Sequence, residues 1–136
     1  MFSDIVGKVN FFKVCSNWIS AYKNKNGEVK EFIEIVNNTL NSDYSYFFNT
    51  WLTKIGYPHL NVTETNIGIK ICQESFTGAI YQFNIPIIYE NDGEIKKIDV
   101  LMNEKEKEID LKFDWALVNG DMESLCTVNY SKFLLE

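Results

Sequence analysis

The spacing of apolar residues changes once along this chain of 136 residues, at Gly56-Tyr57-Pro58. Before this point apolar residues recur every three or four positions, as on one face of a helix, and after it they alternate with polar residues, as in a strand. Gly56 can end a helix in the left-handed conformation, and Pro58 prevents its continuation. The sequence therefore predicts an α+β fold in two parts, a helical segment over residues 1–56 and an antiparallel β-sandwich over residues 57–136.

The helical segment contains about three predicted helices. Ser3 or Asp4 would cap the first, whose expected apolar face consists of Ile5, Val9, Phe12, Cys15, Ile19 and Tyr22. The second runs from about Glu28 to Leu40, and its expected inward residues are Phe32, Ile33, Val36 and Leu40. Asn41-Ser42-Asp43 supplies a break and a cap for the third. The expected inward residues of that helix are Phe47, Phe48, Trp51, Leu52 and Ile55.

Three short helices cannot bury all the aromatic side chains of this segment. The set in question is Phe11, Phe12, Trp18, Phe47 and Phe48. Exposed apolar patches drive association, so we expect dimers or an exchange of helices between copies.

The second part of the chain reads as six to eight short strands. Leu60 and Val62 begin the first, and Ile67, Ile69, Ile71 and Gln73 alternate in the next. Pro86 lies within the apolar run Ile80 to Tyr89, which favours an edge strand or a bulge there. Asn91-Asp92-Gly93-Glu94 is typical of a tight hairpin turn. The expected continuation is a strand containing Ile95, Ile98, Val100 and Met102, a solvated turn at Asn103–Glu108, a strand over Ile109–Phe113 and a last strand over Ser124–Tyr130.

Charge and composition narrow the possible partners. A net charge of −6 argues against a nucleic-acid partner, whose phosphates require a basic surface. No apolar run approaches the roughly 20 residues of a membrane span, and Asp4, Lys8 and Lys13 interrupt the N-terminus too early for a signal peptide. Cys15, Cys72 and Cys126 form no Cys-x-x-Cys pair, which favours buried free thiols in a reducing compartment. We expect a cytoplasmic protein with no membrane partner.

No group of residues in the sequence has the pattern of a catalytic or metal site. The single histidine, His59, follows Pro58 and is best interpreted as a solvent-facing turn residue, since zinc needs several converging donors. The carboxylate pairs Asp110 with Asp114 and Asp92 with Glu94 are expected to be solubilising charge. Trp51 and Trp115 are expected to belong to the core. The sequence therefore predicts no catalytic, cofactor-binding or metal-binding residue, and no enzyme activity for this chain alone.

Five segments in order resemble the zinc aminopeptidases of the gluzincin family, which includes the alanyl, glutamyl and puromycin-sensitive enzymes. Trp51 to Val62 is similar to the family's Trp-x-x-x-x-Gly-Tyr/Phe-Pro-x-x-x-Val stretch, and Ile71 to Phe76 to its Gln-x-Arg-Phe strand. Phe83 to Tyr89, Trp115 to Asn119 and Val128 to Tyr130 resemble its Pro-containing strand, its Trp-x-x-x-Asn segment and its closing strand. Ser75 stands where the family usually has Arg, Ser124 where it has Gly, and Cys126-Thr127 where it has Tyr-Arg.

The resemblance implies that residues 1–56 are the end of a thermolysin-like catalytic domain and that residues 57–136 are the β-sandwich domain after it. The family's zinc ligands lie upstream of the matched region, so no catalytic residue and no zinc ligand is carried over. The expected role is that of a non-catalytic scaffold in an enzyme that removes N-terminal residues from peptides. Its expected partners are the catalytic and C-terminal helical domains. The alternative is a stand-alone interaction module that binds a peptide strand at a sheet edge.

Overall fold

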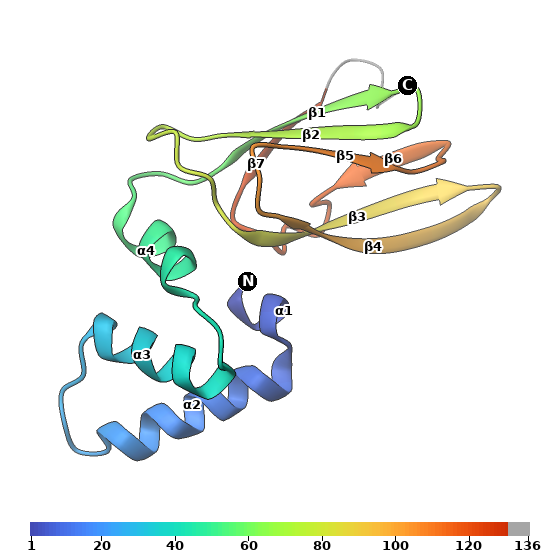
Figure 1. Ribbon diagram of the computed structural model, residues 1–136. Coiled ribbons are helices and arrows are strands. Elements are labelled where there is room, and N and C mark those ends of the chain that lie inside the picture. The colour runs from blue at the N-terminus through green and yellow to red at the C-terminus, as the bar shows by residue number, and fades with distance from the viewer. Residues whose placement is uncertain (131–136) are drawn as a thin grey trace. The chain divides into compact units, whose positions relative to one another are not determined.

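The computed structural model describes residues 1–130, which form helices first and strands afterwards (Figure 1). The helices are α1 (Phe2–Val6), α2 (Lys8–Tyr22), α3 (Val29–Leu40) and α4 (Ser45–Thr53). The strands are β1 (His59–Thr65), β2 (Gly68–Glu74), β3 (Phe83–Asn91), β4 (Glu94–Met102), β5 (Glu106–Asp110), β6 (Trp115–Val118) and β7 (Thr127–Tyr130). The predicted α+β class is confirmed.

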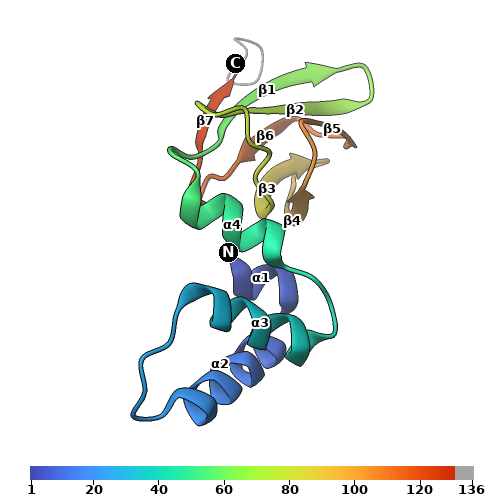
Figure 2. The same cartoon turned by 60° about the vertical axis from the view of Figure 1, so that its left-hand side comes forward.

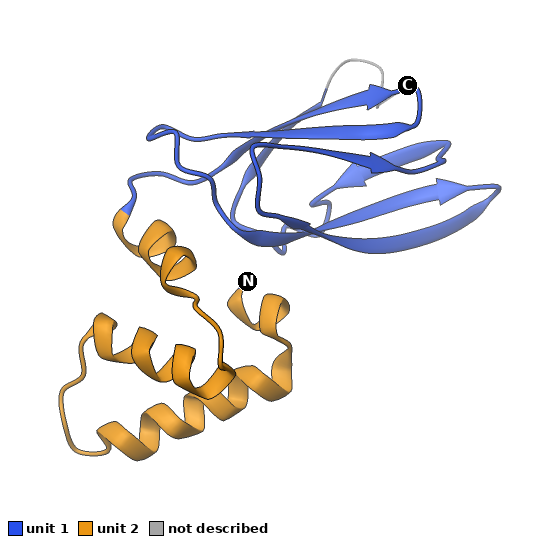
Figure 3. Ribbon diagram, in the orientation of Figure 1, with its two compact units in different colours: residues 1, 54–136 blue, residues 2–53 orange. Residues whose placement is uncertain are grey.

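The chain divides into two compact units, which Figure 3 colours separately. One unit is Phe2–Thr53, and the other is Lys54–Glu136 together with Met1. The change from helix to strand therefore coincides with the change from one unit to the other. The identification of the helical part with the end of a catalytic domain stays a prediction.

The first helix is interrupted where a single one was expected. Gly7 has φ +81°, a left-handed conformation that separates α1 from α2. Ser3 and Asp4 lie inside α1, so neither is the predicted cap.

The buried face of α2 also differs from the expected one. Val14 is fully buried, whereas Val9, Phe12 and Ile19 are 84%, 66% and 63% exposed. The ring of Trp18 stacks on Tyr22, with centroids 4.2 Å apart, and meets Phe32 edge-on at 5.3 Å. Because α2 carries apolar residues on two sides, periodicity alone could not decide which side packs, and the aromatic contacts to α3 select the side of Val14 and Trp18.

Helices α3 and α4 largely follow the prediction. A capping box begins α3, in which the Glu28 amide donates to Glu31 Oε2 at 2.8 Å, and Asn41 ends it in the left-handed conformation. Asp43 Oδ1 accepts the Ser45 amide at 2.8 Å, as expected for a cap of α4. The core of this unit consists of Val14, Ile33, Val36, Phe47 and Phe48, with the partly buried Phe32, Leu40 and Trp51 packed against it.

The end of α4 differs from the prediction. The helix stops at Thr53, so Gly56, with φ +94°, lies beyond its end rather than next to it. Leu52 and Ile55 are 58% and 72% exposed, and their expected burial is wrong. Ile55 lies past the last turn, and no helix carries it onto the buried side.

The strands form a four-stranded sheet of order β5-β2-β1-β7 and a three-stranded sheet of order β4-β3-β6 (Figure 1). All pairs are antiparallel except β1 with β7, which run parallel side by side (Figure 2). Alternate residues of the strands fill the core, as period-two patterning requires. The fully buried apolar ones include Leu60, Val62, Ile69, Ile71, Phe83, Ile85, Ile87 and Met102.

Strand β3 is the centre of its sheet, so the expectation that Pro86 marks an edge strand or a bulge is wrong. The Pro86 carbonyl accepts the Asn119 amide at 2.7 Å, just where β6 ends. The nitrogen and oxygen of a strand residue point to the same side. The missing N–H of Pro86 therefore faces the end of the β6 ladder, and none of the bonds to β4 is lost.

The β3–β4 connection is the predicted tight hairpin. Asn91 pairs with Glu94, and Asp92 and Gly93 have φ +55° and +76°. Two successive positive φ angles define a type I′ turn.

Four other predictions for the strand region need correction. The solvated turn expected at Asn103–Glu108 ends earlier, and the strand expected over Ile109–Phe113 is shifted, because β5 spans Glu106–Asp110 and pairs with β2. The last strand begins at Thr127 rather than Ser124, and Ile67 is a 54% exposed turn residue. Strand β6 was not predicted, because only four residues of it form a ladder and they show little alternation.

Within residues 1–130, no helix combines the length and the apolar character needed to cross a membrane.

Candidate functional site

His59 was expected to be a solvent-facing turn residue; it is partly exposed, but it lies in a strand and not in a turn. It is the first residue of β1, and its Nδ1 lies 2.6 Å from Thr127 Oγ1 of β7. The Tyr57 ring packs against the imidazole, with centroids 4.9 Å apart. This histidine therefore fastens β7 to β1.

The carboxylate pairs also have structural contacts. Asp114 Oδ2 accepts the Asp92 amide at 3.2 Å, and Glu94 pairs with Lys96 at 3.2 Å. Within residues 1–130, no three His, Cys, Asp or Glu side chains gather in a way that could hold a metal ion. The donors in this part of the chain thus do not fit a zinc site, and the prediction that the chain has no catalytic or metal residue remains to be tested by experiment.

The three cysteines are unpaired and partly buried. Burial raises the pKa of the Cys126 thiol to about 11, and the Asn119 amide, 3.3 Å from its sulfur, opposes this shift. Because the thiolate is the reactive form, Cys126 is a poor nucleophile at neutral pH.

Gln73, on β2, is a buried polar side chain of the sandwich with three hydrogen bonds. It is 1% exposed, and its Nε2 donates to the carbonyls of Tyr81, at 3.1 Å, and Glu104, at 2.8 Å. Its Oε1 accepts the Tyr81 amide at 3.0 Å. One side chain therefore ties β2 to the segment before β3 and to the turn after β4. Because both amide hydrogens and the oxygen of Gln73 are hydrogen-bonded within the sandwich, its role is structural rather than reactive.

The same contacts continue to the point where the chain enters the sandwich. Tyr81 is fully buried, and its hydroxyl donates to the Gly56 carbonyl at 3.2 Å. The Pro58 carbonyl accepts the Thr127 amide at 3.2 Å. The Gly56–Pro58 segment is thus fastened to the sandwich from two sides. Burial raises the pKa of Tyr81, which stays a neutral donor at physiological pH.

Asn119 organises the connection between β6 and β7. It is 7% exposed and has φ +54°, a left-handed conformation that asparagine tolerates. Its Oδ1 accepts the Ser124 amide at 3.0 Å, and its Nδ2 donates to the Ser124 carbonyl at 3.0 Å. The Ser124 hydroxyl donates to the Asn84 carbonyl on β3 at 2.5 Å. The loop is therefore closed on itself and attached to the sheet.

Two aromatic residues complete this set of contacts. The Tyr130 hydroxyl donates to the Val118 carbonyl at 2.7 Å and accepts the Val118 amide at 2.9 Å, which joins β7 to β6 across the two sheets. Burial raises the pKa of Tyr130. Trp115 Nε1 donates to the Glu90 carboxylate on β3. No buried side-chain nitrogen or oxygen in the described part of the chain lacks a partner.

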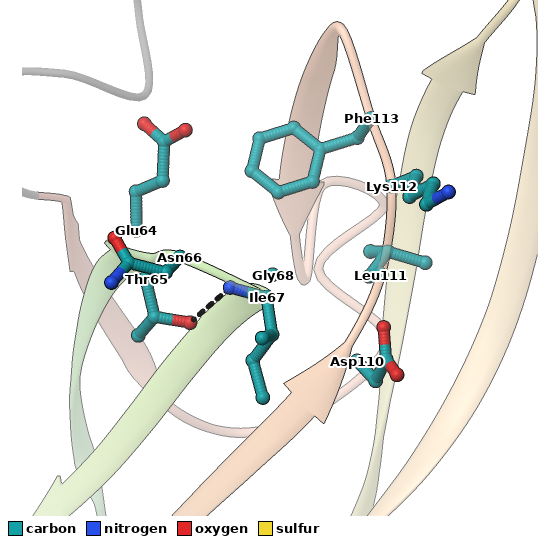
Figure 4. Close-up of a pocket in the computed structure, with 9 residues that line it drawn as sticks. All are labelled: Glu64, Thr65, Asn66, Ile67, Gly68, Asp110, Leu111, Lys112 and Phe113. Atoms are coloured by element: carbon teal, nitrogen blue, oxygen red, sulfur yellow. Dashed lines mark hydrogen bonds between the residues drawn. The ribbon is translucent and has the colours of Figure 1, made fainter.

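A pocket of about 360 Å³ lies between the β1–β2 turn and the segment after β5 (Figure 4). Figure 4 shows the Glu64 and Asp110 carboxylates on opposite sides of it, pointing apart, so the two do not converge on a ligand. The Thr65 hydroxyl accepts the Ile67 amide at 3.4 Å within the turn. This pocket has no arrangement of groups for acid–base chemistry.

The polar contacts coincide with the segments that carry the family resemblance. Gln73, Pro86, Trp115, Asn119 and Tyr130 all lie in the matched stretches. The sequence signal for Gln73 was a polar residue at an inward position of an alternating strand. Tyr81 and Ser124 carried no such signal, because their partners are backbone groups that only the fold brings near.

Comparison with known proteins supports the resemblance at a coarse level. No family model matches the chain. The "Probable aminopeptidase 1" of Saccharolobus solfataricus is 30% identical over 111 residues, which are 78% of this chain and 14% of that protein. The glutamyl aminopeptidase of Sus scrofa is 27% identical over 69% of this chain and 11% of its own length. The alanine/arginine aminopeptidase of Saccharomyces cerevisiae is 25% identical over 96% of this chain and 16% of its own length.

The fold has a counterpart among solved structures. Aminopeptidase A of Legionella pneumophila, crystallised with aspartic acid, matches with a TM-score of 0.74 and 17% identity, over 96% of this chain and 16% of that chain. The chain is therefore similar to a short segment of proteins named aminopeptidases. The predicted resemblance to aminopeptidases is confirmed to that extent, and the zinc class and the segment boundaries stay predictions.

Proposed function

We propose that this chain is a non-catalytic segment of a zinc-dependent aminopeptidase, an enzyme that removes N-terminal residues from peptides, and that it acts as an interdomain scaffold. The observation that carries this proposal is the use of three polar side chains at matched positions, Gln73, Asn119 and Tyr130, for internal support. Gln73, Asn119 and Tyr130 each bond backbone groups of other segments, and none presents a free group to a substrate.

The scaffold role rests on how the chain enters the sandwich. Tyr81 holds the Gly56 carbonyl, and Thr127 holds the Pro58 carbonyl. These two bonds would hold the segment at the start of the sandwich in one conformation. Zinc would be bound by other parts of the enzyme, and the catalytic and C-terminal helical domains would be the partners of this chain. A cytoplasmic location is part of the proposal, and the unpaired cysteines support it.

The first test asks whether the chain alone has activity. Incubation with zinc and an aminoacyl fluorogenic substrate should give no turnover above a heat-denatured control, and equilibrium dialysis should show no tight zinc binding. Turnover that depends on zinc and on folded chain would contradict the proposal.

The second test asks whether the chain can serve as a scaffold. In the S. solfataricus protein, this chain would replace the segment to which it aligns. We expect the chimera to hydrolyse the same substrate, and Gln73→Leu to lower its melting temperature while leaving KM unchanged. A chimera that folds but has no turnover would count against a passive role. So would a Gln73→Leu variant that changes KM and leaves the melting temperature unchanged.

A stand-alone interaction module is the second candidate. The strand that contains Pro86, expected to be an edge or to have a bulge, is central in its sheet, and the long free edge belongs to β4. A module that binds a peptide strand would therefore use the edge of β4.

A further inference from the structure

Strand β4 presents an open edge nine residues long. It lies at the outside of its sheet, next to β3 only (Figure 1). The Pro86 and Glu90 carbonyls of β3 point to the β6 side, where they accept amides of Asn119 and Asp114. The alternate residues of β3, Ile85, Ile87 and Tyr89, must therefore direct their backbone groups to β4. Their partners there are Val100, Ile98 and Lys96.

The other residues of β4 direct their backbone groups to the open edge. These are Ile95, Lys97, Asp99 and Leu101. A direct sign of this direction is the Leu101 carbonyl, which accepts Lys107 Nζ at 2.7 Å instead of a strand amide. The side chains of the same four residues share one face of the sheet and are all exposed. Along the strand, these four side chains are apolar (Ile95), basic (Lys97), acidic (Asp99) and apolar (Leu101).

This order is complementary to itself when a second β4 runs antiparallel. Full overlap of two strands spanning Glu94–Met102 places Ile98 opposite Ile98 at a twofold axis. Lys97 then faces Asp99 of the second copy, and Ile95 faces Leu101 of the second copy. In this register the four residues whose backbone groups point to the open edge form the hydrogen-bonded pairs. The register that pairs the backbone groups is therefore the one that pairs opposite charges and apolar side chains.

We propose that the β4 edge is a self-association surface, at which two copies of this chain pair β4 with β4 and join their three-stranded sheets into one sheet of six. Two Lys–Asp pairs and two Ile–Leu pairs then flank the twofold axis. The pairing needs only the sandwich and is independent of the aminopeptidase proposal.

Contacts already present within one copy are compatible with this pairing. Lys97 Nζ lies 2.6 Å from Glu123 Oε1 and 3.3 Å from Asp121 Oδ2, and an ammonium group has three hydrogens to share. The Leu101 carbonyl keeps a second lone pair beside Lys107. Charges on an edge strand discourage random pairing, and here they also select one register.

The test measures association of the full chain by sedimentation velocity from about 1 μM to about 1 mM. We expect a monomer–dimer equilibrium in this range. Asp99→Lys places lysines opposite each other at two symmetric positions, and Lys97→Asp does the same with aspartates. Each should weaken the dimer about tenfold or more. The double variant K97D/D99K restores opposite charges and should recover the dimer.

Two controls make the test specific. Glu64→Lys has the same charge change as Asp99→Lys, lies exposed outside β4, and should leave the dimer unchanged. Phe12→Ser removes an exposed apolar side chain of α2 and should also leave it unchanged. Amide exchange should slow at Ile95, Lys97, Asp99 and Leu101 as concentration rises, while Lys96, Ile98 and Val100 stay as they are.

Several results would overturn the proposal. These are a wild-type monomer over the whole range, a dimer that Asp99→Lys does not weaken, a double variant that stays as weak as the single ones, or a dimer abolished by Phe12→Ser. Circular dichroism of each variant establishes that it remains folded, and recovery in the double variant excludes a folding defect as the cause of the single effects.

Discussion

Gly68 lies where the backbone of a neighbouring strand leaves no room for a side chain. A Cβ atom there would lie 2.1 Å from the Ile109 carbonyl oxygen and 2.6 Å from the Leu111 nitrogen, both of them backbone atoms that cannot rotate away. We expect Gly68→Ala to lower the free energy of unfolding by about 3 kcal/mol, because β2 and β5 must separate locally. Urea denaturation followed by far-ultraviolet circular dichroism measures this.

Gly78→Ala is the matched control for that change. Gly78 also has a positive φ, +70°, but a Cβ there would meet nothing within 4 Å. Gly78→Ala should lower the free energy of unfolding by only about 1 kcal/mol, which is the cost of a positive φ for a residue with a Cβ atom. Equal losses at both positions would mean that the close approach at Gly68 has no energetic consequence.

Cys126 should make stability depend on pH in the alkaline range. Burial raises the pKa of its thiol from 9.0 to about 11, so between these values the unfolded chain loses a proton that the folded chain retains. The contribution of the neutral thiol to stability is therefore fully present below pH 9 and is lost as the pH rises toward 11. The loss attributable to this group is about 1 kcal/mol, since the side chain is only partly buried.

The measurement compares wild type with Cys126→Ala across that pH range. The variant should lose less stability between pH 9 and pH 11 than the wild type does. The pKa values of Tyr81 and Tyr130 are also raised by burial, and both tyrosines are present in the two proteins, so the part of their effect that is independent of Cys126 cancels in the difference. Parallel curves for the two proteins would show that the thiol ionises freely in the folded state.

At the scale of elements, α3 offers the clearest test of local sequence signals. Its capping box satisfies two amides at the helix start, one of them through the 2.8 Å bond from the Glu28 amide to Glu31 Oε2. Glu31→Ala should cost about 1 kcal/mol of the helical unit's stability. Glu34→Ala, an exposed change on the same helix, should cost much less. Helix content against temperature measures both, and equal effects would contradict the capping role.

Elements with strong local signals were predictable, and those chosen by packing were not. The Asn91–Glu94 turn and the inward residues of α3 followed from turn chemistry and from a single apolar face. Helix α2 has two apolar sides, and only contacts such as Trp18 with Phe32 decide between them. Pro86 suggested an edge, yet the end of the β6 ladder provides an equivalent position inside the sheet.

In the candidate site, too, some residues could be predicted from the sequence and their partners could not. Gln73 could be found because it interrupts a row of inward apolar residues, and the resemblance drew attention to Asn119 and Tyr130. Their partners could not be inferred, because they are carbonyl and amide groups distant in sequence, such as Glu104 for Gln73 and Val118 for Tyr130. Contacts to backbone leave no residue-type signature in a sequence.

At the scale of the whole molecule, the two units should differ in stability. The sandwich core has members from Leu60 to Val118, all within one unit, and its buried polar groups are satisfied by partners in the same unit. The helical unit has only five buried residues in its core cluster, and α2 leaves Val9, Phe12 and Ile19 exposed. Small domains bury a smaller share of their surface and are marginal for that reason.

We therefore expect residues 54–136 to fold without the helices, whereas residues 2–53 alone should lose most of their helix content. The full chain should unfold in two steps, the first with loss of helical signal and the second shared with the isolated sandwich. Circular dichroism melts of the three proteins, with amide exchange at Ile71 and Ile87 as sandwich markers, measure this. Exchange at those two amides as fast as in unfolded chain, once the helices are removed, would mean that the sandwich depends on them and that the boundary at Lys54 divides one cooperative domain.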